Sequence, residues 1–207
     1  MPESRESKST DSEYAEWDRI YRKYPLETLP WELGRPRKVL VDLVEGGLMR
    51  GGKALDLCCG AGTNAVYLAK KGFQVAGVDI SSKAVEYARR KADEAKVKVN
   101  FTVQSFLNLP FEDEEFDFVF DMGCFHHVKT RDRRKFIEGV RRVLKKHGLY
   151  LMVCFSYRNG PAWNHFTKGQ IVDVFTALFE IKSIDHISSV EGDGYTRYFY
   201  VTLMERK

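Results

Sequence analysis

The stretch from Lys53 to Asn64 limits the possible folds of this chain more than any other. Its apolar residues, among them Leu55 and Leu57, predict a short buried strand that runs directly into a turn of small residues. Gly60 and Gly62 give that turn the backbone freedom that a tight reversal from strand to helix needs. The N–H groups at the start of the following helix would face outward, and such helix starts bind anionic or polar ligand groups. We therefore expect the chain to be organised around this turn.

Length and composition indicate one globular domain. The chain has 207 residues, of which 43% are hydrophobic, so it can bury a substantial core without disulfides or metal. Its net charge of +4 arises from 33 basic and 29 acidic residues spread along the sequence, too mild and mixed a charge to indicate nucleic-acid binding. No segment has the apolar length of a membrane span or the pattern of a signal peptide. A cytoplasmic protein without nucleic-acid or membrane partners is predicted.

The cysteines show no metal-binding pattern. Cys58, Cys59, Cys124 and Cys154 include one adjacent pair and no C-x-x-C spacing, and all lie in apolar, strand-like surroundings. Free cysteine is commonly buried in such surroundings. The pattern favours reduced thiols in the core over a metal site, so no metal is expected.

The first part of the chain divides into two segments. Residues 1–13 are polar and lack apolar periodicity, which predicts a disordered tail. Residues 14–24 carry aromatic side chains at helical spacing, and residues 25–36 form a proline-bounded segment. Residues 14–36 therefore form either an N-terminal helix and lid segment over a ligand site, or a strap on the core. Residues 37–207 would form the main domain.

Helical and strand patterns alternate through most of that domain. Such alternation implies a parallel sheet with helices on both faces, an α/β fold. The last third breaks the pattern, because two strands separated by a short polar stretch should pair antiparallel. The expected helices cover 39–45, 63–71, 82–95, 131–145 and 168–178, and the expected strands 54–57, 74–79, 97–103, 116–122, 149–155, 179–187 and 195–205.

Polar side chains follow the ends of the predicted parallel strands, where ligands bind in open sheets. They are the glycine turn, Asp79, Ser105, and Asp121 with the residues just after it. A carboxylate at Asp79 could accept both hydroxyls of a ribose, so this combination indicates an adenosine-type ligand.

Two cofactors fit that combination. Gly60-x-Gly62-x-x-Ala65 also matches the dinucleotide fingerprint, with an acid about 20 residues further on, as in NAD(P)-dependent oxidoreductases of Rossmann type. A phosphate-binding Walker loop is excluded because no Lys-Ser or Lys-Thr follows the glycines. The turn by itself leaves the dinucleotide alternative open.

Several short motifs follow one another in order along the chain. They are Asp56-Leu-Cys-Cys-Gly60-Ala-Gly62, Val78-Asp79-Ile80-Ser81, Leu109-Pro110-Phe111 ahead of Phe116-Asp117-Phe118-Val119-Phe120-Asp121, and Phe125-His126-His127-Val128. With the closing antiparallel pair, this order resembles the class I S-adenosylmethionine (SAM) dependent methyltransferases. The resemblance covers about residues 34–207. It implies a three-layer sandwich around a mostly parallel, seven-stranded Rossmann-like sheet whose last strand is antiparallel, with SAM as cofactor and S-adenosylhomocysteine (SAH) as product.

The resemblance also implies roles for individual residues. Gly60 and Gly62 would hold the methionine part of SAM, and Asp56 would brace the turn or bind the amino group. Asp79 would accept the ribose hydroxyls, and Asp121 would lie near the methionine end. Adenine would be held by Ile80, Ser105 and Phe106. Cys58, Asn64 and Met122 complete the expected cofactor set, and Tyr21 and Trp31 are expected to contact the sulfonium region, where ring faces attract positive charge. Two positions depart from the family pattern, because Cys58 replaces the first glycine and Ser105 replaces an acid.

A narrower likeness concerns the acceptor. Leu29-Pro30-Trp31-Glu32-Leu33-Gly34-Arg35-Pro36 resembles the thiol, thiopurine and tellurite-resistance branches, which act on small molecules. A soft sulfur acceptor needs no base, whereas for a hydroxyl or amine His127 or His126 could take the proton. A small-molecule methyltransferase acting as a monomer or homodimer is therefore predicted. A non-catalytic SAM-binding partner subunit is the remaining alternative.

Overall fold

The computed structural model describes residues 16–207. The predicted tail over residues 1–13 lies outside the described residues, as does the first part of the predicted N-terminal helix. No helix within residues 16–207 has the length and apolar character needed to cross a membrane.

A single seven-stranded sheet forms the middle layer, in the order β3-β2-β1-β4-β5-β7-β6. The first five strands run parallel, and β7 pairs antiparallel with both of its neighbours. The predicted sheet is therefore confirmed. The strands are β1 (Lys53–Leu57), β2 (Gln74–Asp79), β3 (Val99–Val103), β4 (Phe116–Met122), β5 (Leu144–Phe155), β6 (Phe179–Val190) and β7 (Thr196–Arg206).

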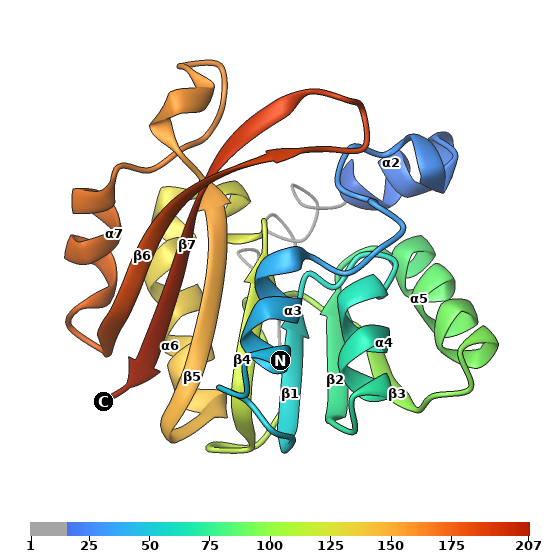
Figure 1. Cartoon of the computed structure of the whole chain (residues 1–207), viewed down its shortest axis with the longest axis horizontal. Helices are drawn as coiled ribbons and strands as arrows, with labels where there is room; N and C mark the ends of the chain where they lie inside the picture. Colours follow the sequence, from blue (N-terminus) through green and yellow to red (C-terminus); the bar gives the residue numbers. More distant parts are fainter. Residues whose placement is uncertain (1–15) are drawn as a thin grey trace, which may run out of the picture.

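Helices cover both faces of the sheet, so that the fold has three layers (Figure 1). One core lies between the sheet and helices α6 and α7, and a second lies on the face covered by α3, α4 and α5. Leu55 and Leu57 of β1 belong to the first core while Ala54 belongs to the second, which explains why this strand is apolar almost throughout. The helices are α2 (Glu16–Lys23), α3 (Lys38–Glu45), α4 (Thr63–Lys70), α5 (Ser82–Glu94), α6 (Arg133–Val143) and α7 (Lys168–Phe175).

Two helix starts follow from local side-chain chemistry. The Ser81 hydroxyl accepts the Ala84 N–H at 3.0 Å and caps α5, as predicted. Thr167 caps α7 and forms a reciprocal capping box with Gln170. These short-range signals were readable from the sequence because every partner lies within three residues.

Two helix ends were predicted wrongly. The helix expected over 131–145 ends at Val143, and β5 begins at once with Leu144. Leu144 is fully buried and pairs with Phe116, so its place in the core prevails over the helix-forming lysines that follow. The register then shifts before Leu149 pairs with Phe118. The last helix also ends earlier than expected, at Phe175.

The carboxyl edge of the parallel strands is covered from two sides. In Figure 1 the long β6–β7 hairpin arches over this edge toward α2. The Gly192 N–H at the hairpin tip donates to the Pro30 carbonyl at 2.8 Å. Arg37 and Glu191 form a two-point ion pair with N–O distances of 2.7 and 2.8 Å. The N-terminal segment and the hairpin thus close over the same edge.

Gly62 provides a test of the turn after β1. We expect Gly62→Ala to lower the free energy of unfolding by about 2–5 kcal/mol, because a left-handed alanine costs about 1–2 kcal/mol and overpacking adds about 1–3 kcal/mol. Its φ is +75°, and a Cβ would lie 2.8 Å from the Ala88 Cβ and from the Phe101 ring. Gly72→Ala is the matched control, because its φ is +89° but no atom lies within 4 Å of the added Cβ. Equal losses in urea titrations would show that the close approach at Gly62 is unimportant.

Candidate active site

A cavity of about 340 Å³ lies at the covered edge of the sheet. Parallel pairing explains its position, because Leu57 pairs with Val78 on one side and Asp121 on the other, so the loops after β1, β2 and β4 start side by side. The lining residues are Trp17, Ile20, Tyr21, Pro30, Trp31, Glu32, Leu33, Arg35, Arg37, Asp56, Cys58, Cys59, Gly60, Thr63, Asn64, Asp79, Ile80, Phe106, Met122, Gly123, Cys124, His126, His127, Phe155, Trp163, Glu191, Arg197 and Phe199.

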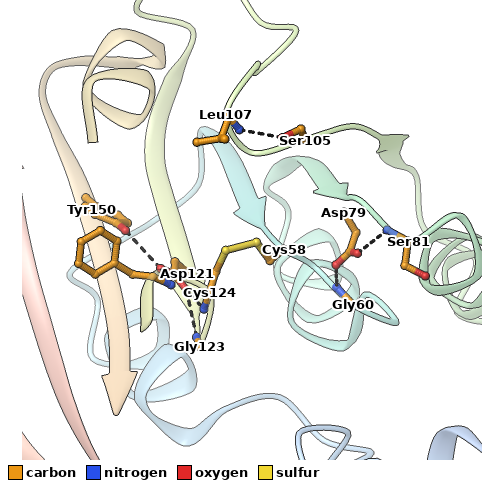
Figure 2. Close-up of a disulfide and its surroundings, with 11 residues drawn as sticks. Cys58, Gly60, Asp79, Ser81, Ser105, Leu107, Asp121, Gly123, Cys124 and Tyr150 are labelled. Carbon is orange, nitrogen blue, oxygen red and sulfur yellow. Dashed lines mark hydrogen bonds between the residues drawn. A yellow bond between two sulfur atoms is a disulfide. The ribbon is translucent and has the colours of Figure 1, made fainter. Parts of the chain in front are cut away.

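Asp79 joins the glycine turn to the end of β2 (Figure 2). One carboxylate oxygen accepts the Gly60 N–H and the other accepts the Ser81 N–H, each at 2.9 Å. Burial raises the pKa of Asp79 to about 6 in spite of these donors. Each oxygen keeps a lone pair, so the carboxylate can still accept hydrogen bonds from a ligand.

Asp56 holds a buried oxygen without a partner. Its side chain is 1% exposed and lines the cavity, and among the described residues nothing hydrogen-bonds to Oδ2. Burial, together with the nearby charges of Asp79 and Asp121, raises the pKa of Asp56 well above its usual value. Buried polar atoms are rarely left without a partner, which makes this oxygen a candidate ligand contact.

Glu32 was not predicted as a site residue, yet it lies against the glycine turn. Its Oε1 accepts the Ala61 N–H at 3.2 Å and the Tyr21 hydroxyl at 3.3 Å. The Trp31 indole N–H in turn donates to the Tyr21 oxygen at 2.8 Å. The acid of the Pro-Trp-acid segment was visible in the sequence, but its approach to a turn 29 residues later depends on the tertiary fold. Glu32, Asp56 and Asp79 make this end of the cavity acidic.

Most of the predicted site residues lie in the cavity wall. They are Tyr21, Trp31, Asp56, Cys58, Gly60, Asn64, Asp79, Ile80, Phe106, Met122, His126 and His127. Gly62, Ser105 and Asp121 lie behind that wall. Gly62 shapes the turn in a left-handed conformation, and the buried Ser105 hydroxyl accepts the Leu107 N–H at 3.3 Å.

Asp121 organises the loop after β4 from behind (Figure 2). Its carboxylate accepts the N–H groups of Gly123, Cys124 and Phe125, and the Tyr150 hydroxyl donates to it at 3.4 Å. Burial raises its pKa to about 7 despite these donors. This network fixes the loop that carries the two histidines.

The two predicted histidines have different surroundings. His126 is 2% exposed, and its Nδ1 accepts the Phe155 N–H at 3.2 Å. Its ring stacks on the Phe155 ring, with 4.0 Å between the ring centroids. The His127 ring packs edgewise against Trp17, with 4.8 Å between the ring centroids. Burial lowers the pKa of His127 to about 4 and that of His126 well below its usual range. Both imidazoles are therefore neutral near pH 7.

Aromatic rings also line the cavity, and Trp31 among them lies next to the acidic end. Trp17 lies 5.4 Å from Trp31, and Phe155 lies 5.3 Å from Trp163 and 5.2 Å from Phe199, measured between ring centroids. We call these five rings, with the His127 ring, the aromatic wall. The loop over residues 157–166, with Trp163, was expected to help cover the substrate, and Trp163 does line the cavity. Phe199 was not predicted at the site, because it lies on β7, far along the chain from the glycine turn.

The cysteine prediction was half wrong. Cys59 and Cys154 are free and buried, as expected, but Cys58 and Cys124 form a disulfide (Figure 2). They are 66 residues apart in sequence. The parallel pairing of β1 with β4 brings the loops that carry them together, with a Cα–Cα distance of 5.9 Å. Such a pairing cannot be read from cysteine spacing alone.

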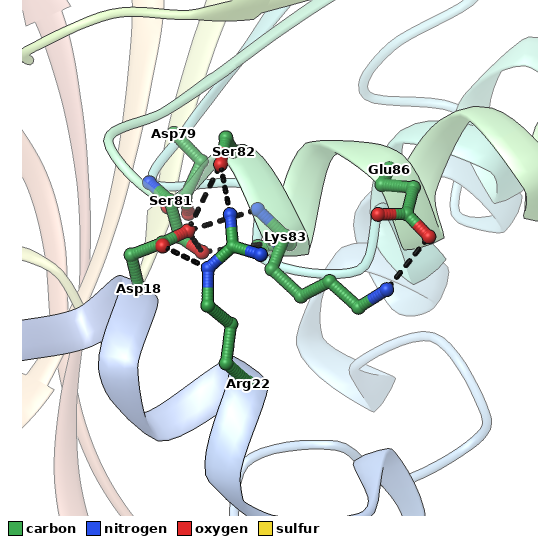
Figure 3. Close-up of polar contacts among 8 residues, drawn as sticks. Asp18, Arg22, Asp79, Ser81, Ser82, Lys83 and Glu86 are labelled. Atoms are coloured by element: carbon green, nitrogen blue, oxygen red, sulfur yellow. Dashed lines mark hydrogen bonds and ion pairs between the residues drawn. The ribbon is translucent and has the colours of Figure 1, made fainter.

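Helix α2 is fixed beside the cavity through the start of α5 (Figure 3). Asp18 accepts the Lys83 N–H at 2.9 Å and the Ser81 hydroxyl at 2.8 Å, and Arg22 bonds both Asp18 and Ser82. Partial burial opposes ionisation, but these donors lower the pKa of Asp18 to about 2. A carboxylate at a helix start is also favoured by the helix dipole.

Comparisons with known proteins agree with this arrangement. A family model described as a methyltransferase domain matches residues 54–148. An uncharacterized methyltransferase of Schizosaccharomyces pombe is 33% identical over 105 residues, which cover 51% of this chain and 72% of that protein. An uncharacterized methyltransferase of Synechocystis sp. is 39% identical over 104 residues, which cover 50% of this chain. The match spans only 47% of that second relative.

Solved structures share the fold. A protein studied for the conversion of a disulfide bond into a thioacetal group during echinomycin biosynthesis has a TM-score of 0.84 at 24% identity, covering 94% of this chain and 91% of that chain. Magnesium protoporphyrin IX methyltransferase from Synechocystis, with bound SAM, has a TM-score of 0.68 at 22% identity, covering 82% of this chain and 77% of that chain. Identities this low support the fold alone.

These relatives are methyltransferases and not oxidoreductases, which decides between the two cofactors that the glycine turn left open. The chain belongs to the class I SAM-dependent methyltransferases and is an enzyme that uses SAM as its cofactor.

Proposed function

We propose that this enzyme methylates a small acceptor with an aromatic body and a soft nucleophilic atom such as sulfur. One observation carries the proposal: a single cavity joins an acidic end, at the glycine turn, to the aromatic wall. The acidic end would hold SAM, and the acceptor would lie against the rings.

The residues at the acidic end fit SAM. Bound SAM supplies a methyl group on a positively charged sulfur and also carries an amino group. The Glu32 carboxylate offers negative charge to these groups, and the Oδ2 atom of Asp56 can accept a hydrogen bond from the amino group. The Asp79 carboxylate can accept hydrogen bonds from the ribose hydroxyls. Ile80 and Phe106 line the same end and would pack on adenine.

The state of the histidines supports a soft acceptor. With a pKa of about 4, His127 is a weak base and a poor proton acceptor for a hydroxyl or ammonium group. An aromatic thiol is largely ionised at neutral pH and needs no base, so positioning can supply most of the rate. We assign His127 to the acceptor side, where it would take a proton only from a harder acceptor, and His126 to positioning Phe155.

The N-terminal segment would act as a lid. Residues 14–36 are proposed as this lid and residues 37–207 as the methyltransferase domain. Three contacts support the proposal: Asp18 at α5, Glu32 at the glycine turn, and the Pro30 carbonyl, which accepts the Gly192 N–H at the hairpin tip. A closed lid would exclude water from the transferred methyl group. A cytoplasmic location, a monomeric or homodimeric state and the absence of nucleic-acid and membrane partners stay predictions.

The acceptor proposal is tested with thiophenol, aniline, phenol and an aliphatic thiol, by following SAH release from SAM. We expect the highest kcat/KM with thiophenol. His127→Phe keeps an aromatic ring, so kcat with thiophenol should stay within about threefold, whereas any phenol methylation should fall by about 100-fold or more if His127 acts as base. Turnover of phenol or aniline but not of thiophenol would contradict a soft acceptor.

Asp79 should make cofactor binding depend on pH. A carboxylate accepts ribose hydroxyls better than a neutral carboxyl group does, so SAH affinity should be constant above pH 7 and fall as pH drops through about 6, the pKa of Asp79. Asp79→Asn should remove this inflection and weaken SAH binding at pH 8 by about 10- to 150-fold, from a charge-assisted contribution of about 1.5–3 kcal/mol. Asp113→Asn, at an exposed carboxylate, is the control for calorimetric titration. Unchanged affinity in Asp79→Asn would place the cofactor elsewhere.

Asp18 should hold the proposed lid in its closed position over the cofactor. Asp18→Ala removes the carboxylate that links α2 to the start of α5. Loss of a helix cap costs about 0.5–2 kcal/mol, so if the lid must close over the cofactor we expect SAH affinity to fall by about 2- to 30-fold. Asp42→Ala, which removes an exposed pair with Lys38 in α3, is the control. A simple strap on the core predicts instead a lower melting temperature with unchanged SAH affinity.

A further inference from the structure

The Cys58–Cys124 disulfide lies in the wall of the cavity, and no step of methyl transfer uses it. It links the two loops that follow β1 and β4 (Figure 2). Cys58 immediately precedes the glycine turn, and Cys124 precedes the histidines. Both cysteines line the same cavity as Asp56 and Asp79. A ligand at the acidic end would therefore cover the disulfide.

The two sulfur-bearing residues differ in exposure. Cys58 is half-buried, whereas Cys124 is 5% exposed. Cys124 is further enclosed because its N–H is bound by Asp121 and it lies in the core with Phe125. A reagent that enters the cavity therefore meets Cys58 first.

The backbone at Cys58 gives the bond a structural role. Its φ is +54°, a left-handed conformation that costs a residue other than glycine about 1–2 kcal/mol. The bond to Cys124, with the hydrogen bond from the Cys59 N–H to the Val78 carbonyl at 3.0 Å, holds the chain there. Breaking the disulfide removes one of these restraints next to Gly60.

We propose that the Cys58–Cys124 disulfide is a thiol–disulfide exchange site that opens into the cofactor cavity, reacts with small thiols and dithiols, and is covered when SAM or SAH is bound. This inference rests on the proposed placement of SAM in the cavity. It goes beyond methyl transfer, because it makes the redox state of the enzyme depend on cofactor occupancy.

The exchange balances as follows. A thiolate attacks the Cys58 Sγ, the bond to the Cys124 Sγ breaks, and Cys124 leaves as a thiolate that takes a proton from water. A second thiol group attacks the mixed disulfide and releases Cys58 as a thiol. The incoming thiols are oxidised to a disulfide and Cys58 and Cys124 are reduced, a transfer of two electrons.

Cofactor binding and reduction should affect each other in two ways. Bound SAH covers the disulfide, so the rate of reduction should fall with the fraction of enzyme that is free of SAH. Conversely, reduction loosens the turn next to Gly60 and should weaken SAH binding; coupling between sites commonly amounts to about 5-fold or more. Cys59 and Cys154 should not take part, because both are buried and burial raises the pKa of each thiol well above its usual value.

The first experiment needs no variant. The oxidised enzyme is mixed with dithiothreitol, and new thiols are counted with time under denaturing conditions, with and without SAH. We expect two thiols to become four. With SAH at 100 times its Kd, the rate should fall about 100-fold, since only the free enzyme reacts. An unchanged rate, with SAH binding confirmed by calorimetry in the same sample, would overturn the proposal.

The possible failures are distinct. If SAH does not bind at all, the proposed cofactor placement is wrong, and so is the proposal that SAH covers the disulfide. If SAH binds but does not protect the disulfide from dithiothreitol, only the proposal of an exchange site in this cavity is wrong. Four thiols in the purified protein that diamide cannot reduce to two would also overturn the proposal.

A second experiment tests which sulfur is reached from the cavity. In Cys124→Ser the Cys58 thiol should be alkylated by iodoacetamide and protected by SAH. In Cys58→Ser the Cys124 thiol should react at least about tenfold more slowly, because thiol reactivity follows access. Cys154→Ala is the control, because it lies outside the cavity wall and should keep both the disulfide and the protection by SAH. Faster alkylation of Cys124 than of Cys58 would contradict the assigned point of attack.

Discussion

Parallel pairing of β1 with its two neighbours is the constraint on which the site depends. Leu57 pairs in register with Val78 of β2 and Asp121 of β4, so the three strands end side by side at the same edge of the sheet. The end of each strand then contributes a different part of the site: the glycine turn after β1, the Asp79 carboxylate of β2, and the loop with the histidines after β4. A shift of this register by one residue would turn every side chain of β1 to the opposite face. The double-sided core of Leu55, Leu57 and Ala54 opposes such a shift.

Three acidic side chains are buried at the cavity wall or directly behind it: Asp56, Asp79 and Asp121. Burial raises the pKa values of Asp56, Asp79 and Asp121, which means that the folded protein without a ligand disfavours their ionised forms. A cationic ligand stabilises the ionised forms and reverses that tendency. The arrangement is thus poor for the stability of the empty protein and well suited to binding a positively charged sulfur, as expected where a functional site conflicts with local stability.

Local chemistry explains which features could be predicted from the sequence. The buried strands and the cap at Ser81 were predicted correctly, because each depends on residues that are close together in the chain. The order of the motifs can likewise be read directly from the sequence. The fold and the positions of Asp56 and Asp79 beside the glycine turn followed from these motifs. The end of α6 was wrong because the core position of Leu144 prevails over local helix preference. Three features depend on long-range packing, which no local pattern records: the Cys58–Cys124 bond, the approach of Glu32 to the glycine turn, and the contribution of Phe199 to the cavity.

The ion pair between Arg37 and Glu191 joins the residue that precedes α3 to the tip of the β6–β7 hairpin. Its two side chains are 16% and 3% exposed, so both charges are largely removed from water. Such a pair gains little net stability, because desolvation offsets the attraction, but separating the partners would leave Glu191 buried and unpaired. The pair therefore favours one docked arrangement over partly open ones. The Gly192 N–H also donates to the Pro30 carbonyl, so moving the hairpin tip away would break its contacts with Arg37 and with the N-terminal segment together.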